Sequence, residues 1–76
     1  MHSIKEITYN ELDNFIGKKV HFISDCEFFP NFDVIVTIIS YSISNNNEII
    51  FNTITDKNRK QMKIGSKMKN LQFSFL

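Results

Sequence analysis

The sequence is poor in the residues on which several classes of functional site depend. Its single cysteine, Cys26, excludes an intrachain disulfide and leaves too little thiol for a structural zinc site. Its two glycines, Gly17 and Gly65, stand alone, which excludes a glycine-rich phosphate-binding loop. The spacings of an EF-hand loop and of an HExxH metal site are also missing. We therefore expect no cofactor, no metal ion and no enzymatic activity.

No apolar run is long enough to cross a membrane. The longest apolar-rich segment, residues 33–43, is too short for a span and is interrupted by polar residues. The N-terminus lacks the basic region and apolar run of a signal peptide. A free cysteine without a targeting signal fits a reducing interior, so we expect a cytoplasmic protein. The abundance of Ile, Asn, Lys and Phe indicates an AT-rich genome, such as that of a low-GC bacterium or its phage.

Two long stretches of the chain each lack charge of one sign. No Lys or Arg occurs from Asp25 to Asp56, and no Asp or Glu follows Asp56. Residues 1–56 carry a net charge of −5 and residues 57–76 a net charge of +6, although the whole chain carries only +1. This asymmetry is the strongest unusual feature of the sequence.

The N-terminal part predicts a short helix over about residues 9–16. Thr8 is a good N-cap residue, and Glu11 three positions later completes a capping box. Gly17 suits the left-handed position that ends such a helix. Two turns are too few to be stable alone, so the apolar face of this helix must pack against other elements.

After Gly17 the apolar residues alternate with the period of a strand. The pattern predicts strands at about 19–24, 33–44, 48–55, 61–64 and 71–75. The second strand is apolar on both faces at first, which predicts a bend or bulge near Ile38. We expect the last strand to turn Phe75 inward. The expected core consists of Leu12, Phe15, Ile16, Val20, Phe22, Val34, Val36, Ile39, Ile50, Ile54, Ile64, Leu71 and Phe73.

A chain of 76 residues is one domain, and five short strands with tight turns favour a small antiparallel barrel over residues 1–76. The helix would cover one open end. The order of elements is helix, glycine, strand, long first loop, three-strand meander and short last strand. This order resembles the SH3-like and Sm-like small barrels, and the resemblance implies a mainly β fold without implying an activity.

The first candidate binding site is the stretch DCEFFPNFD, residues 25–33. Pro30 marks it as a connection between strands. Exposed aromatic rings flanked by acidic residues are typical of a protein-binding hot spot. We expect a protein partner with a basic surface. Alternatively, Phe29 and Phe32 fold back to close the barrel end, in which case the acids are merely solvated. Exposure of at least one of the rings of Phe28, Phe29 and Phe32 would favour binding. The candidate residues are Asp25, Glu27, Phe28, Phe29, Phe32 and Asp33.

The second candidate is the basic segment 57–69, for which nucleic acid is the alternative partner. Aromatic residues for base stacking are missing from this segment, and the acidic stretch 25–56 would repel a polyanion wherever it adjoins. The competing interpretation is an edge strand decorated with Lys, which discourages aggregation. The basic residues are Lys57, Arg59, Lys60, Lys63, Lys67 and Lys69.

Two further arrangements are weaker. His21 and Cys26 could form a nucleophile and base, but no orienting group or oxyanion site accompanies them. A metal set drawn from His21, Asp25, Cys26, Glu27 and Asp33 matches no known spacing. The best expectation is therefore a small binding module, such as an accessory subunit or an inhibitor encoded by a phage or mobile element. The apolar last strand could also pair with a second copy of the chain.

Overall fold

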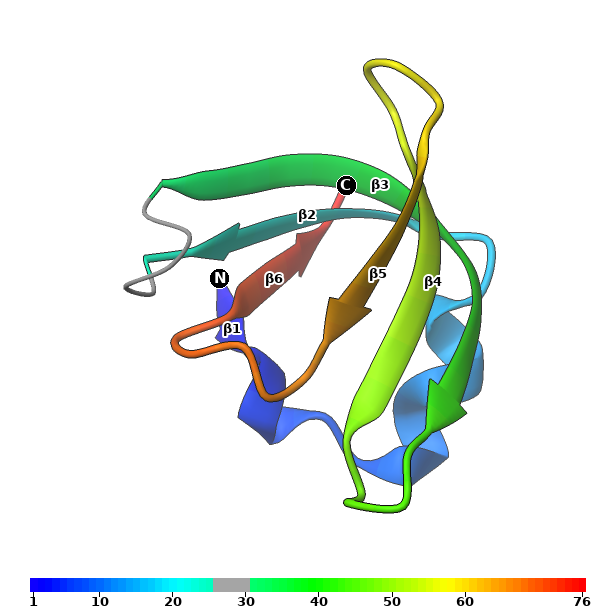
Figure 1. Cartoon of the computed structure of the whole chain (residues 1–76), viewed down its shortest axis with the longest axis vertical. Coiled ribbons are helices and arrows are strands. Elements are labelled where there is room, and N and C mark those ends of the chain that lie inside the picture. Colours follow the sequence, from blue (N-terminus) through cyan, green and yellow to red (C-terminus); the bar gives the residue numbers. More distant parts are fainter. Residues whose placement is uncertain (26–30) are drawn as a thin grey trace.

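A computed structural model describes residues 1–25 and 31–76 and shows a mainly β fold. Its strands form one antiparallel sheet in the order β1-β6-β2-β3-β4-β5 (Figure 1). No helix in the described residues is long and apolar enough to cross a membrane. The elements are β1 (His2–Ser3), the 3-10 helices η1 (Ile4–Glu6) and η2 (Tyr9–Phe15), β2 (Lys19–Ser24), β3 (Phe32–Ile43), β4 (Ile49–Thr55), β5 (Gln61–Gly65) and β6 (Gln72–Phe75).

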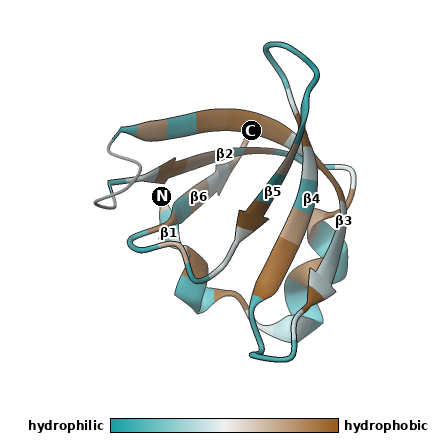
Figure 2. Cartoon of the chain, viewed as in Figure 1, coloured by the Kyte–Doolittle hydropathy of each residue, from teal (hydrophilic) through white to brown (hydrophobic). Residues whose placement is uncertain are grey.

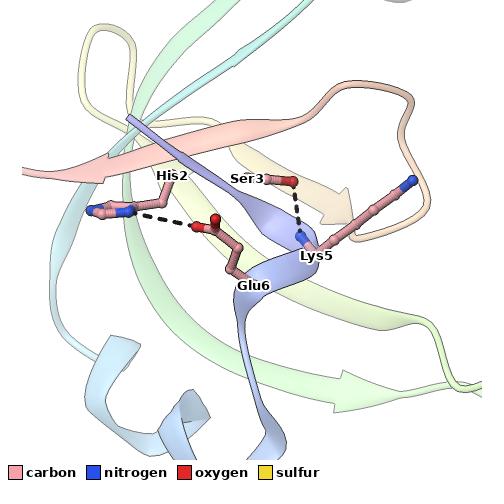
Figure 3. A network of polar contacts seen from close by, with 4 residues as sticks. All are labelled: His2, Ser3, Lys5 and Glu6. Atoms are coloured by element: carbon pink, nitrogen blue, oxygen red, sulfur yellow. Dashed lines mark hydrogen bonds and ion pairs between the residues drawn. The ribbon is translucent and has the colours of Figure 1, made fainter.

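The start of the chain forms an edge strand that the sequence does not reveal. Ile4 N–H donates to the carbonyl of Leu71 at 2.9 Å, which holds β1 beside β6. Ser3 caps η1 by accepting a hydrogen bond from the backbone N–H of Lys5 at 3.3 Å. His2 and Glu6 approach within 3.6 Å on the solvent side (Figure 3). A strand of two residues is too short to show alternation.

Helix η2 lies where the sequence places a helix, with 3-10 geometry. Thr8 is the N-cap, but its hydroxyl contacts the Glu11 carboxylate at 3.2 Å and caps no backbone N–H, so the predicted capping box is wrong in its hydrogen bonds. Gly17 has φ +80°, the left-handed conformation expected after the helix. Its N–H donates to the carbonyl of Ile38 at 2.7 Å, which ties the end of the helix to β3.

A second tie between η2 and β3 is polar. The Tyr41 hydroxyl donates to the carboxylate of Asp13 at 2.8 Å. This hydrogen bond raises the pKa of Tyr41 above 10.0, and desolvation and the nearby negative charge act in the same direction.

The long strand β3 serves two halves of the sheet. Residues 32–37 pair with β2, whereas residues 36–43 pair with β4, and the register shifts between Ile38 and Ser40. The predicted bulge near Ile38 is therefore confirmed. At the bulge Ile38 points into the core, while Ile39 is 50% exposed, so the placement of Ile39 in the core was wrong.

The sheet is not closed into a barrel. After β5 the chain turns twice, with hydrogen bonds from Met68 N–H to Gly65 C=O (3.2 Å) and from Leu71 N–H to Met68 C=O (3.3 Å). Strand β6 then pairs with β2 and β1, which leaves β5 at one end of the sheet (Figure 1). The predicted antiparallel β architecture is present without the predicted closure.

The core lies between the curved sheet and the helices η1 and η2 (Figure 1). Phe15 joins helix to sheet, since its ring lies 5.4 Å from that of Phe51 and 5.3 Å from that of Phe73. Figure 2 shows hydrophobic stretches in β2, β3, β4 and β5 and hydrophilic residues along the β4–β5 turn. The buried apolar residues are Ile4, Ile7, Leu12, Phe15, Val20, Phe22, Val36, Ile38, Ile49, Phe51, Ile64, Leu71 and Phe73.

Other expected core positions differ from the structure. Ile16 is 45% exposed because η2 ends at Phe15 and the chain is already extended at Ile16. Ile50 and Ile54 are only half-buried, because β4 turns its other face to the core. Val34 is half-buried against the core. Phe75 shares the inner face with Phe73 but remains 49% exposed at the open end of the sheet.

Candidate functional site

The acidic candidate lies at the end of the β2–β3 hairpin. Asp25 follows β2 directly, while Phe32 and Asp33 begin β3. Three of the six predicted residues, Glu27, Phe28 and Phe29, lie outside the described residues, as does Cys26.

A hollow of ≈ 480 Å³ opens beside this hairpin end. The β5–β6 connection forms its other wall and is held there by two side-chain hydrogen bonds. Ser24 Oγ donates to the carbonyl of Lys69 at 2.7 Å, and Asn70 Nδ2 donates to Asp25 Oδ1 at 3.0 Å. Asn31 and Asn70 have φ of 65° and 57°, a backbone conformation that Asn tolerates well. The lining residues are Ile23, Ser24, Asp25, Asn31, Phe32, Asp33, Asn70 and Gln72.

Asp33 stands on the outer face of the sheet and is held by a neighbour on β2. Its Oδ1 lies 2.6 Å from Nε2 of His21, which is diagonally opposite across the ladder. The Asp33 carboxylate remains largely exposed. The structure therefore pairs His21 with Asp33. The conceivable pair of His21 with Cys26 involves a residue outside the described part of the chain.

Phe32 is half-buried and packs against the core. For this ring the structure favours the alternative in which the aromatic side chain folds back. The question of exposure for Phe28 and Phe29 lies outside the described residues. The described part of the acidic site is therefore a polar hollow with one aromatic wall.

The basic segment divides into groups at the two ends of β5. Lys57, Arg59 and Lys60 lie in the β4–β5 turn, which projects from the body of the protein (Figure 1). Lys63 is exposed on β5 itself. Lys67 and Lys69 lie in the β5–β6 connection. A five-residue strand spans about 17 Å, so the two end groups are well separated.

Acidic groups adjoin both ends of this segment. The backbone N–H of Lys67 donates to Glu48 Oε2 at 3.3 Å, and Lys69 lies beside the Asp25 hollow through its carbonyl bond to Ser24. At the other end Asp56 pairs with Lys19 at 3.1 Å. Carboxylates therefore lie beside both ends of the basic segment, where they would repel a nucleic-acid backbone.

Residues 1–25 and 31–76 contain no group of three or more His, Cys, Asp or Glu side chains placed to hold a metal ion. The conceivable metal set includes Cys26 and Glu27, which the structure does not describe. The sequence did not reveal the roles of Ser24, Asn70 and Gln72 in the hollow. Only the pairing of β6 with β2 brings the last two to the hairpin end.

Comparison with known proteins provides no family for this chain. No family model matches it, and neither the curated proteins nor the solved structures contain a significant match.

Proposed function

We propose that the chain is a small non-enzymatic binding module of the cytoplasm, and that its partner is a protein with a basic surface. One observation carries the proposal. The exposed carboxylates of Asp25 and Asp33 border a single hollow whose described lining contains no Lys or Arg.

The chemistry of the hollow suits a Lys or Arg side chain. Ionised carboxylates only accept hydrogen bonds, and Arg or Lys are their strongest protein donors. The side-chain carbonyls of Asn31 and Gln72 supply further acceptors at the rim. The half-buried ring of Phe32 offers apolar surface for the stem of a long cationic side chain.

The two carboxylates are already held in place. Asp25 accepts from Asn70, and Asp33 contacts His21. A group that is ordered before binding loses less conformational entropy when the partner arrives, so these contacts favour affinity. The net charge of −5 over residues 1–56 would also accelerate the encounter with a basic partner.

The likeness of the element order to SH3-like and Sm-like small barrels forms part of this proposal. A bent β3 shared between β2 and β4 supports it. A role as an accessory subunit, or as an inhibitor encoded by a phage or mobile element, is the biological setting that we propose for such a module.

The test is affinity capture from cells of the source organism or its host, with and without nuclease treatment. The bait is the wild-type chain or the double variant Asp25→Lys/Asp33→Lys. Glu6→Lys/Glu11→Lys is the matched control, because it makes the same charge change at two exposed acids, one in η1 and one in η2. Circular dichroism verifies that all three are folded.

We expect a protein partner that survives nuclease, is retained by Glu6→Lys/Glu11→Lys and is lost with Asp25→Lys/Asp33→Lys. A partner lost on nuclease treatment would contradict the proposal and favour nucleic acid. Equal retention by all three baits would exclude the acidic hollow as the binding site.

A further inference from the structure

Strand β5 presents an unpaired backbone edge within the described part of the chain. It is the terminal strand of the sheet and pairs only with β4 there. Two hydrogen bonds at its ends fix which residues face β4, namely Thr55 N–H to Lys60 C=O (2.9 Å) and Ser66 N–H to Ile49 C=O (2.8 Å). Backbone groups of an antiparallel strand alternate in direction. Gln61, Lys63 and Gly65 therefore direct their backbone groups away from β4.

Positive charge surrounds this edge. Lys63 projects from the middle of β5, and cations flank both ends of the strand in the β4–β5 turn and the β5–β6 connection. Residues 57–76 contain no Asp or Glu, and none of the described ion pairs uses a cation of this segment. These charges are available to an incoming acidic group.

The side chains of β5 point alternately to the core and to solvent. Met62 and Ile64 face the core, whereas Gln61 and Lys63 face solvent. Met62 is only half-buried, consistent with the open edge beside it. A strand added at this edge would place alternate side chains next to Met62 and Ile64, where apolar groups fit, and the others next to Lys63, where carboxylates fit.

We propose that β5 binds an extended segment of a partner protein in which acidic and apolar residues alternate, and that this segment adds to the sheet as a further strand. The backbone bonds at Gln61 and Lys63 provide the attachment, and the alternation provides the specificity. This surface is separate from the acidic hollow and takes a partner of the opposite charge.

Glu48 sets the position of the acidic residues along the edge. Its carboxylate lies against Gly65, where a Cβ would collide with it, and accepts from Lys67 N–H. A partner carboxylate beside Gly65 would meet this negative charge. The acidic residues of the partner therefore lie next to Lys63 and toward the β4–β5 turn.

Two other occupants fit less well. A second copy pairing β5 with β5 about a two-fold axis would bring Lys63 close to its own equivalent, and like charges across a ladder are destabilising. A single-stranded nucleic acid would need stacking surfaces, but the hollow beside β5 is lined by aliphatic and polar residues. These residues are Ile39, Asn52, Thr53, Ile54, Gln61, Met62 and Lys63.

The test is amide hydrogen exchange of the full chain, measured by NMR while a capped peptide of alternating Glu and Val is added. Exchange at Gln61 and Lys63 should slow by about tenfold or more at saturation, because both N–H groups gain acceptors. Met62 and Ile64 are internal controls, since their N–H groups already face β4. A peptide with Lys in place of Glu should have no effect.

Lys63→Glu should weaken binding of the Glu–Val peptide by about fivefold or more, because a like charge replaces an attractive one. Lys18→Glu makes the same change away from β5 and should leave the affinity unchanged.

Unchanged exchange at Gln61 and Lys63 at peptide saturation, or no binding at all, would overturn the proposal. Lys63 would then serve to discourage aggregation at the edge of the sheet. Slowing that instead follows protein concentration without peptide would identify a second copy as the occupant. Binding of an oligothymidylate in preference to the peptide would identify nucleic acid.

Discussion

Truncation of Phe15 tests the junction on which the fold depends. Phe15 is the last residue of η2 and is 2% exposed. Its ring lies 5.4 Å from that of Phe51 on β4 and 4.8 Å from that of Phe75 on β6. The side chain therefore connects the helix with strands from both halves of the sheet. Its neighbour Ile16 provides a matched control, because it is apolar and adjacent but 45% exposed.

We expect Phe15→Ala to lower the free energy of unfolding by about 3–5 kcal/mol, the usual range for a buried aromatic residue. Ile16→Ala should cost about 1 kcal/mol or less, since roughly half of the side chain is already in water. A domain of this size has about 4–11 kcal/mol of stability in total, so Phe15→Ala removes a large part of it. Phe15→Leu serves as a milder variant that stays folded.

Equilibrium urea unfolding, followed by circular dichroism, measures the difference between the variants. The chain contains no Trp, so backbone signal is the appropriate probe. An equal cost for Ile16→Ala and Phe15→Ala would contradict the burial of Phe15 and the exposure of Ile16. It would mean that both side chains face the core, as the sequence alone had indicated.

Two further predictions concern local contacts. In a Tyr9→Phe chain, which leaves Tyr41 as the only tyrosine, phenolate absorbance should titrate above 10.0, and Asp13→Asn should lower this pKa. Because the folded-state pKa of Tyr41 is raised, its contribution to stability is complete below pH 10 and is lost as the pH rises through the folded pKa; a titration unaffected by Asp13→Asn would contradict the Tyr41–Asp13 bond. Gly17→Ala should cost about 1–2 kcal/mol in urea unfolding, because φ is +80° and nothing lies near the added methyl group to offset the strain, whereas Gly17→Asn should cost less. Equal stability of Gly17→Ala and wild type would argue against the left-handed turn.

Local signals predicted the elements better than their assembly. The helix and five strands follow from capping residues, glycines and alternation, and the bulge of β3 follows from its two apolar faces. The sequence does not show which face of β4 points to the core, because apolar residues of IIFNTIT occur on both faces of the strand. The structure buries Thr53 and Thr55 because partners satisfy their hydroxyls, the Met62 carbonyl at 2.9 Å for Thr53 and the Asn58 side chain for Thr55.

Long-range pairing explains what the sequence could not provide. No local pattern predicts that β6 pairs with β2 and that β5 remains at the edge. These pairings decide whether the sheet closes. They also bring Asn70 and Gln72 beside Asp25, so one wall of the hollow comes from a segment that no motif marks. The carboxylates of the site could be found from composition, whereas their amide neighbours could not.

The most direct test of the acidic hollow is a titration of the isotope-labelled full chain with a short capped peptide containing Lys and Arg, followed by amide chemical shifts. The proposed function predicts saturable shifts at Asp25, Asn31, Asp33, Asn70 and Gln72 that disappear in Asp25→Lys/Asp33→Lys. Shifts of equal size at the other exposed acids, such as Glu6 and Glu11, would show non-specific attraction and contradict it.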